Sequence, residues 1–419
     1  MRPIFLPKIY ARHLIAARAS SGYASNMTLT SIQTIAFAAL VVYFGRFLKS
    51  RIAFIDRYNL PSPVIGGFLV AFLLAFFKSQ DIFIIQFDKA FEQALMICFF
   101  ASVGYSASYR LLIHGGKAVV FFLLLSIAGL VLQIIGGVGA AYLMGQHLLM
   151  GVLTGPVALT GGPGTALAFG PVFEAAGVQG ASAIGLTTAM GGILLGGLIG
   201  TPISTYLINK HRLKDHPVKH TQEHIDSVSL RAFPGTDLLM HFLAIAFIMG
   251  VGTAISAWIN DFGITLPIYI GSMIIAAIVR NIEDVKPTFK INADWIEEIG
   301  SVALTLFIAT AIMTLKLEEL RHAALPIMGF LAIQAILVAI TAIGPAYWVA
   351  GRDYDAAVIS SGYVGFMMGT TANAMANMHS LTHKYGVSRK AFLVVPLVGS
   401  CFIDFFNAAI VTLCLNFLK

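Results

Sequence analysis

Long apolar runs separated by short polar stretches make up most of this chain. Between Lys117 and Lys210 the only Asp, Glu, Lys or Arg is Glu174, and a soluble domain could not bury that length of apolar chain. Ten runs are long enough to cross a bilayer as helices. They predict spans at residues 29–48, 61–77, 91–109, 118–145, 181–207, 236–257, 264–280, 299–315, 324–348 and 388–415.

Two further apolar segments are broken by glycine and proline. Residues 150–171 hold six glycines, which weaken a continuous helix by entropy and by lost backbone bonds. Residues 357–378 have small residues around Gly365 and Gly369. Irregular backbone at membrane depth survives only where it is buried in protein or lines a wet cavity, because each unsatisfied N–H or C=O costs several kcal/mol there. Each break is therefore predicted to form part of a binding site.

Composition and charge support a membrane protein with many spans. Of all residues, 58% are hydrophobic and 11% are charged, against about 25% charged in a soluble protein. The net charge of +7 needs no nucleic acid, because basic residues that flank spans on the cytoplasmic side produce such an excess. If the segment at Thr28 starts outside, 18 Lys or Arg lie in cytoplasmic loops and five lie outside.

The first 26 residues stand apart from this pattern, with four basic residues and no acid. They are either an Arg-rich targeting segment or an upstream stretch with Met27 as the working start. We favour the second interpretation and exclude residues 1–26 from the fold. The three cysteines lie in apolar runs, so they imply no disulfide framework.

The two halves of the chain repeat weakly at a shift of about 206 residues. FFAS at 99–102 pairs with FIAT at 307–310, and Gly155 falls opposite Gly362. Five passes in each half, an odd number, would turn the second copy upside down, which is typical of inverted-repeat secondary transporters. The alternative explanation of these short matches is chance similarity between apolar runs. The predicted units are residues 27–208, a cytoplasmic linker at 209–235, and residues 236–419.

The first break offers chemistry suited to a carboxylate. Thr160-Gly161-Gly162-Pro163-Gly164-Thr165 supplies backbone N–H groups and two hydroxyls with little side-chain bulk. A half-helix that starts after the break adds its positive dipole end, and freed carbonyls suit a hard cation such as Na⁺. The alternative is that glycines only permit tight helix packing, which we prefer for the row at Gly192, Gly196 and Gly200.

The last span carries an acid well inside an apolar run. Asp404 has Ser400 four residues before it and Asn407 three after it, so a continuous helix would place all three on one face. A carboxylate at that depth costs about 2.5–3.5 kcal/mol on insertion scales, so it needs a partner. A bound cation, a substrate ammonium group or a proton would each serve.

Three stretches carry a specific resemblance: GPVALTGGPGTALAF, YDAAVISSGYVGFMMGTTANAMANM and KAFLVVPLVGSCFIDFFNAAIV. They resemble the sodium/glutamate symporter family, and the similarity covers nearly the whole chain from Met27 on. The resemblance implies two inverted five-helix halves, each with a re-entrant loop between its fourth and fifth helices, at about 150–171 and 357–378. It also implies Na⁺-coupled uptake of glutamate across the bacterial inner membrane.

The chain departs from the family pattern in both loops. Relatives carry Gly-Gly-X-Gly in the first loop, matched here at 161–164, but Pro163 replaces a more usual polar residue. The second loop reads GFMMG at 365–369, where relatives keep a denser glycine pattern. These departures leave the type of transport in place and leave open whether the substrate is glutamate, another acidic amino acid or a related dicarboxylate.

Together these observations predict an all-α polytopic membrane protein that is a transporter and not an enzyme, a homodimer without organic cofactor or nucleic-acid partner. A membrane subunit of a Na⁺-pumping decarboxylase and a channel are the rival classes, but nothing here forms the charge rings or carbonyl filter of a channel. Asp404 and Ser400 are the candidate Na⁺ ligands. The predicted substrate-binding residues are Thr160, Gly161, Gly162, Gly164, Thr165, Gly369, Thr370, Thr371, Asn373 and Asn407.

The charge distribution makes a topological prediction. The loop at 210–231 is expected in the cytoplasm and Lys419 outside, because 18 basic residues sort to one side and five to the other. Cysteines introduced into this loop should resist an impermeant thiol reagent in intact cells and react after permeabilisation. Labelling of the loop in intact cells would reverse the predicted orientation.

Overall fold

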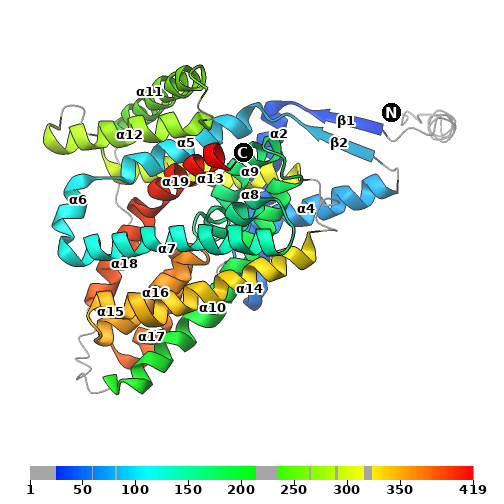
Figure 1. Ribbon diagram of the computed structural model, residues 1–419. Helices are drawn as coiled ribbons and strands as arrows, with labels where there is room; N and C mark the ends of the chain where they lie inside the picture. Colours follow the sequence, from blue (N-terminus) through cyan, green and yellow to red (C-terminus); the bar gives the residue numbers. More distant parts are fainter. Residues whose placement is uncertain are drawn as a thin grey trace, which may run out of the picture.

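A computed structural model of the chain describes residues 25–58, 60–80, 83–213, 235–263, 266–287, 291–315 and 323–418. The described part is almost entirely helical (Figure 1). Residues 1–24 and most of the predicted linker, 214–234, lie outside the described residues.

Helices occupy all ten predicted ranges. Six of the described helices are long and apolar enough to cross a membrane, and a bent pair near the C-terminus makes a seventh candidate. These features fit a polytopic membrane protein.

In the first half the helices are α2 (Ser31–Arg51), α3 (Ala53–Arg57), α4 (Ser62–Ser79), α5 (Ala90–Ser106), α6 (Tyr109–His114), α7 (Gly116–Leu143) and α10 (Ala181–Lys210). In the second half they are α11 (Gly235–Asn260), α12 (Ile268–Val285), α13 (Ala293–Met313), α14 (Ala324–Thr341), η4 (Ala342–Ala346), α15 (Tyr347–Ala350), α18 (Arg389–Cys401) and α19 (Ile403–Phe417).

The broken segments form two helical hairpins. Hairpin 1, residues 148–175, consists of α8 (Leu148–Val152), η1 (Leu153–Val157) and α9 (Gly162–Ala175). Hairpin 2, residues 354–385, consists of α16 (Tyr354–Met367) and α17 (Thr371–Tyr385). The helix breaks are residues 158–161 and 368–370, and the tips named below are these breaks together with the adjoining helix-end residues Gly162 and Met367. Each tip falls inside the segment where the glycine pattern predicted it.

One departure from the all-α prediction is a pair of short strands. β1 (Ser25–Leu29) pairs in parallel with β2 (Phe83–Phe87), with Met27 opposite Ile85, and Figure 1 shows the pair beside the start of α2. The first predicted span began at residue 29, but α2 begins at Ser31. The Thr30 hydroxyl accepts a hydrogen bond from the backbone N–H of Gln33, whose side chain accepts from the backbone N–H of Thr30. This capping box fixes the start of the helix.

The last predicted span, 388–415, is not continuous. α18 and α19 meet at Phe402 and are bent by 40° relative to each other. Just before the bend the Ser400 hydroxyl donates to the carbonyl of Pro396, 2.8 Å away, a backbone contact that bends helices. The continuous helix assumed in placing Ser400, Asp404 and Asn407 on one face is therefore absent: Ser400 lies in the last turn of α18, whereas the other two belong to α19.

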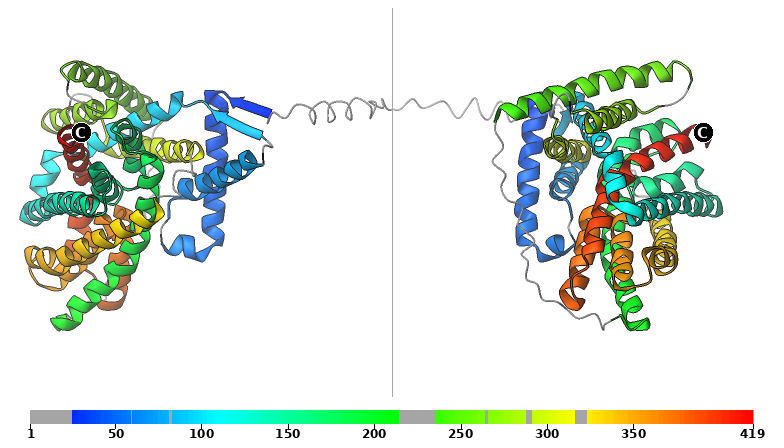
Figure 2. Two further views of the ribbon diagram at one scale, coloured as in Figure 1. Left: turned by 45° about the vertical axis from the view of Figure 1, so that its right-hand side comes forward. Right: turned by 90° about the vertical axis from the view of Figure 1, so that its left-hand side faces the viewer.

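The helices form two groups that lie side by side (Figure 2). One group contains α2, α4, α5, α11, α12 and α13; the other contains both hairpins with α7, α10, α14, α18 and α19. The groups meet where α9 contacts α13, where α18 contacts α5 and where α19 contacts α5 and α12. We call them the first and the second helix group.

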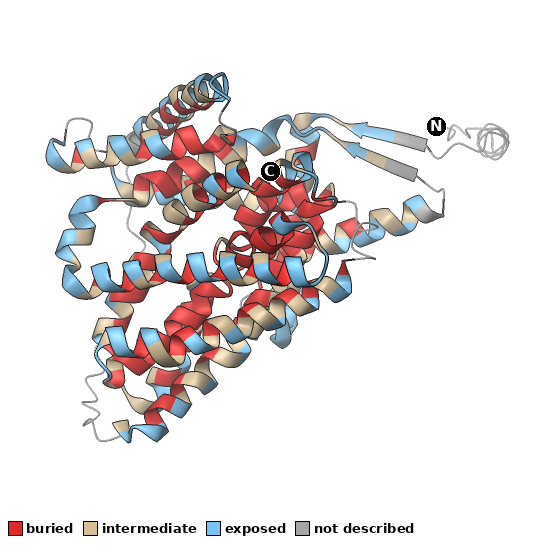
Figure 3. Cartoon of the chain, viewed as in Figure 1, coloured by how far each residue is buried: buried red, intermediate tan, exposed pale blue. Residues whose placement is uncertain are grey.

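The hairpins form the buried centre of the second helix group. Every residue from 149 to 160 and from 356 to 369 is buried, whereas α7 and α11 keep exposed outer faces (Figure 3). α10 packs against both α9 and α16. A Cβ on Gly192 would lie 2.5 Å from the carbonyl oxygen of Met368, which confirms tight packing as the role of this glycine.

Candidate functional site

A cavity of about 390 Å³ lies where the two hairpin tips face the first helix group. Its walls come from α4, α5, α13, both tips and the α18–α19 bend. The lining includes glycines, hydroxyls and two carboxylates, so it differs from the apolar core around it. The lining residues are Pro61, Pro63, Phe99, Ser102, Val103, Ser106, Thr160, Gly161, Pro163, Gly164, Glu297, Gly300, Ser301, Leu304, Thr305, Ile308, Phe366, Gly369, Thr370, Thr371, Ala372, Gly399, Ser400, Ile403 and Asp404.

Hairpin 1 brings the start of a helix to this cavity. Gly155 has a non-helical backbone (φ −94°, ψ −116°), and Pro156 follows it without an N–H group. The chain then turns through Gly162, whose φ of +69° lies in the left-handed region that glycine adopts without steric cost. α9 begins there with Pro163 at its start, a position that proline favours. The N-terminus of α9 therefore adjoins the cavity.

Hairpin 2 brings a second helix start to the same place. Thr370 caps α17, because its hydroxyl accepts a hydrogen bond from the backbone N–H of Asn373. The tips touch: a Cβ on Gly162 would lie 3.4 Å from both the Gly369 carbonyl oxygen and Thr370 Cγ2. Two helix N-termini thus adjoin one cavity, and their free N–H groups and dipoles favour an anion.

A carboxylate lines the same cavity as the tips. Asp404 lies in the first turn of α19 and is half-buried. Its carboxylate has no hydrogen-bond or ion-pair partner among the described residues. Ser400 lines the cavity beside it, with its own hydroxyl hydrogen donated to Pro396. A carboxylate so placed suits a cationic ligand, either a metal ion or an ammonium group.

Eight of the predicted site residues line the cavity: Thr160, Gly161, Gly164, Gly369, Thr370, Thr371, Ser400 and Asp404. The other four do not. Gly162 makes the contact between the tips, and Thr165 is buried in α9. The amide of Asn373 donates to the carbonyl of Ile193, and that of Asn407 donates to the carbonyl of Pro156, each at 3.0 Å. These two asparagines hold α10 and hairpin 1 in place.

The first helix group contributes cavity residues that the sequence did not single out. Glu297, Ser301 and Thr305 follow one another along α13, at four-residue spacing, and all three line the cavity. Ser102 and Ser106 do the same on α5. The spacing of four residues places each set on one helical face, and this periodicity of polar residues in apolar helices was the available signal.

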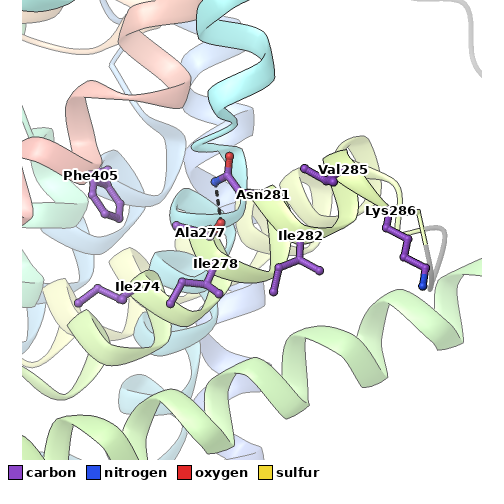
Figure 4. A pocket seen from close by; sticks show the side chains of 8 residues that line it. All are labelled: Ile274, Ala277, Ile278, Asn281, Ile282, Val285, Lys286 and Phe405. Atoms are coloured by element: carbon purple, nitrogen blue, oxygen red, sulfur yellow. Dashed lines mark hydrogen bonds between the residues drawn. The ribbon is translucent and has the colours of Figure 1, made fainter.

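A second hollow runs along α12 and has a different character. Its volume is about 600 Å³, and its lining is mostly aliphatic, with Ile274, Ile278 and Ile282 along one face and Phe405 at the end (Figure 4). The amide of Asn281 donates to backbone carbonyls, including that of Ala277 at 2.8 Å. With few polar groups, this hollow is a poor site for a charged solute.

The chain is similar in sequence to known membrane transporters. The family model described as "Sodium/glutamate symporter" matches residues 27–387. A sodium/glutamate symporter of Haemophilus influenzae is 36% identical over 391 residues, covering 92% of this chain and 97% of the relative. The sodium/glutamate symporter of Escherichia coli is 35% identical over 390 residues, with the same coverage. The match begins at Met27 and takes in both hairpins whole, and by this evidence the chain belongs to the sodium/glutamate symporter family.

Proposed function

We propose that the chain is a Na⁺-coupled symporter that imports glutamate, with the cavity at the hairpin tips as its binding site. The observation that carries this proposal is the meeting of two helix N-termini with a carboxylate that has no partner among the described residues. An amino acid with two carboxylates and one ammonium group matches such a site in charge. The names of the relatives support Na⁺ as the coupling ion and glutamate as the substrate.

Each group at the site has a distinct proposed task. The N–H groups that begin α9 and α17 hold the substrate carboxylates, as helix N-termini do for other anions. Asp404 holds either Na⁺ or the α-ammonium group. The proposed Na⁺ ligands are hydroxyls and freed carbonyls, joined by Asp404 if that carboxylate faces Na⁺, and all are oxygen donors that suit a hard cation.

The order of the helices supports two inverted repeats, at 27–208 and 236–419. Apart from the short α3 and α6, each half contains three helices, then a long helix, a broken hairpin and a last helix, which in the second half is the bent pair α18–α19. In each half the hairpin precedes the last helix and has its break in a buried, glycine-containing segment. We propose that both hairpins are re-entrant, entering the membrane from opposite sides, since broken backbone at membrane depth needs this protein surrounding.

Transport would then follow from a shift of one helix group against the other around the site. The cavity walls on the first helix group come from the start of α4, the end of α5 and the first half of α13. Under the predicted orientation these are the cytoplasmic ends of the three helices. We therefore interpret the structure as a state open toward the cytoplasm, in a protein of the bacterial inner membrane that works as a homodimer.

Another acidic solute remains the main alternative substrate, because residues 365–369 carry GFMMG at the tip of hairpin 2. A decarboxylase subunit would also need a buried acid and broken helices, but it would require soluble partner subunits. Transport by the purified single chain in vesicles distinguishes the two classes.

Uptake into proteoliposomes should require Na⁺ and should increase with an inside-negative potential. Moving one net charge is worth about 2.3 kcal/mol per 100 mV, which biases accumulation roughly fiftyfold. The measurement is counterflow and uptake of labelled acidic amino acids and dicarboxylates, with Na⁺ replaced by choline in the control. Equal uptake in choline would exclude Na⁺ coupling.

Asp404→Asn should impair transport while the protein still inserts, because the amide keeps the shape and removes the charge that pairs with a cation. If Asp404 faces Na⁺, the variant should need far more Na⁺ for the same rate. If it faces the ammonium group, glutamate affinity should fall at saturating Na⁺. Glu298→Gln, which removes an exposed carboxylate outside the cavity lining, is the matched control. Wild-type kinetics in Asp404→Asn would place the site elsewhere.

Gly162→Val should abolish uptake. A branched residue is strained at φ +69°, by about 1–3 kcal/mol, and its side chain would press on the tip of hairpin 2. Gly139→Val in α7 is the control, because a Cβ there meets no atom within 4 Å. Uptake and membrane insertion are measured for both. Normal uptake by Gly162→Val would show that close approach to this tip is not needed.

A further inference from the structure

A buried glutamine of α7 connects the two hairpin tips. Gln133 is 1% exposed. Its side-chain oxygen accepts a hydrogen bond from the Thr160 hydroxyl at 2.8 Å. Its side-chain nitrogen donates to the backbone carbonyl of Met367, also at 2.8 Å. One amide thus contacts both tips through residues 27 and 234 positions away in the sequence.

Gln133 is itself held by a second buried glutamine. Gln334 of α14 is fully buried and donates its side-chain N–H to the backbone carbonyl of Gln133 at 2.8 Å. Both glutamines belong to long helices of the second helix group, so the amide has rigid support. All of these groups are buried, and hydrogen bonds in such low-dielectric surroundings are stronger than those exposed to water.

The direct contact between the tips is weaker. The Thr160 hydroxyl reaches the Met367 carbonyl oxygen only at 3.4 Å, near the limit for a hydrogen bond. The other contact is the packing of Gly162 against Gly369 and Thr370, which resists approach but not separation. The two short bonds that oppose separation both pass through Gln133.

We propose that Gln133 is a positioning residue that holds the two hairpin tips at the spacing at which the N-termini of α9 and α17 bind one anionic substrate. The residue itself is not part of the cavity lining. The Thr160 hydroxyl therefore serves this clamp, although Thr160 lines the cavity. The inference rests on the proposed site between the tips and extends it to residues that do not touch the substrate.

The test compares Gln133→Met, Thr160→Val and the double variant. Each single change removes clamp bonds while nearly keeping side-chain size, so each should raise the KM for glutamate at saturating Na⁺ about tenfold, equivalent to about 1.4 kcal/mol. The maximal rate should change less. Because both changes break the same connection, the double variant should be no worse than the poorer single variant.

Thr154→Val is the matched control. Thr154 is also a buried threonine of hairpin 1, but its hydroxyl donates within its own helix segment, to the Met150 carbonyl. Its KM should stay within about twofold of the wild-type value. All variants are compared at equal amounts of inserted protein, and Gln133→Asn, one methylene too short to reach both tips, replaces Gln133→Met if that protein fails to insert.

Two results would overturn the proposal. One is a Gln133 variant with the same KM as Thr154→Val, since the clamp would then have no effect on binding. The other is a double variant whose defect is the product of the single defects, about hundredfold, because Thr160 would then act on the substrate independently of Gln133. Failure of the site itself is distinguishable, since it would appear as wild-type kinetics in Asp404→Asn.

Discussion

The structure depends on one constraint: backbone that is not helical must have its polar groups satisfied inside the protein when it lies at membrane depth. Both hairpins break at glycine-containing tips, and every residue that leads into the breaks, from 149 to 160 and from 356 to 369, is buried. The cost of such breaks explains why α7, α10 and α14 surround them. It also explains why the amide of Asn407 donates to a backbone carbonyl beside a break, that of Pro156.

The same breaks create the chemistry of the site. A helix interior has no free N–H groups, whereas each new helix start offers several together with a positive dipole end. Gly162 and Thr370 make two such starts meet, one by its left-handed backbone and the other by capping α17. The half-buried Asp404 lines the same cavity, and under the proposed function it would meet a cationic group while the helix starts meet an anionic one. Free backbone N–H groups favour binding of an anion but are costly at membrane depth. Packing of the surrounding protein around the tips limits this cost.

The cavity lies between the two helix groups, and both groups contribute residues to its lining. The tips and the α18–α19 bend come from the second helix group, whereas Glu297, Ser301 and the serines of α5 come from the first. Apolar packing also joins the groups, as where the ring of Phe169 in α9 lies 5.3 Å from that of Tyr269 in α12. At the cavity, hydroxyls and carboxylates line the boundary instead, which suits a surface that would separate and re-form in the proposed transport cycle.

The sequence by itself determined the membrane class, the helix in each of the ten ranges and the place of both breaks, because hydrophobicity, glycine and proline act locally. It also identified eight residues of the cavity, since small residues and hydroxyls at a helix break are recognisable from composition. Only the tertiary structure decided which polar residues face the cavity and which bind backbone. Asn373, Asn407 and Gln133 lie in apolar runs like Asp404, yet each is bonded to a segment far away in the chain. The β1–β2 pair also depends on contacts between distant segments, and a pattern along one chain does not record which segments become neighbours.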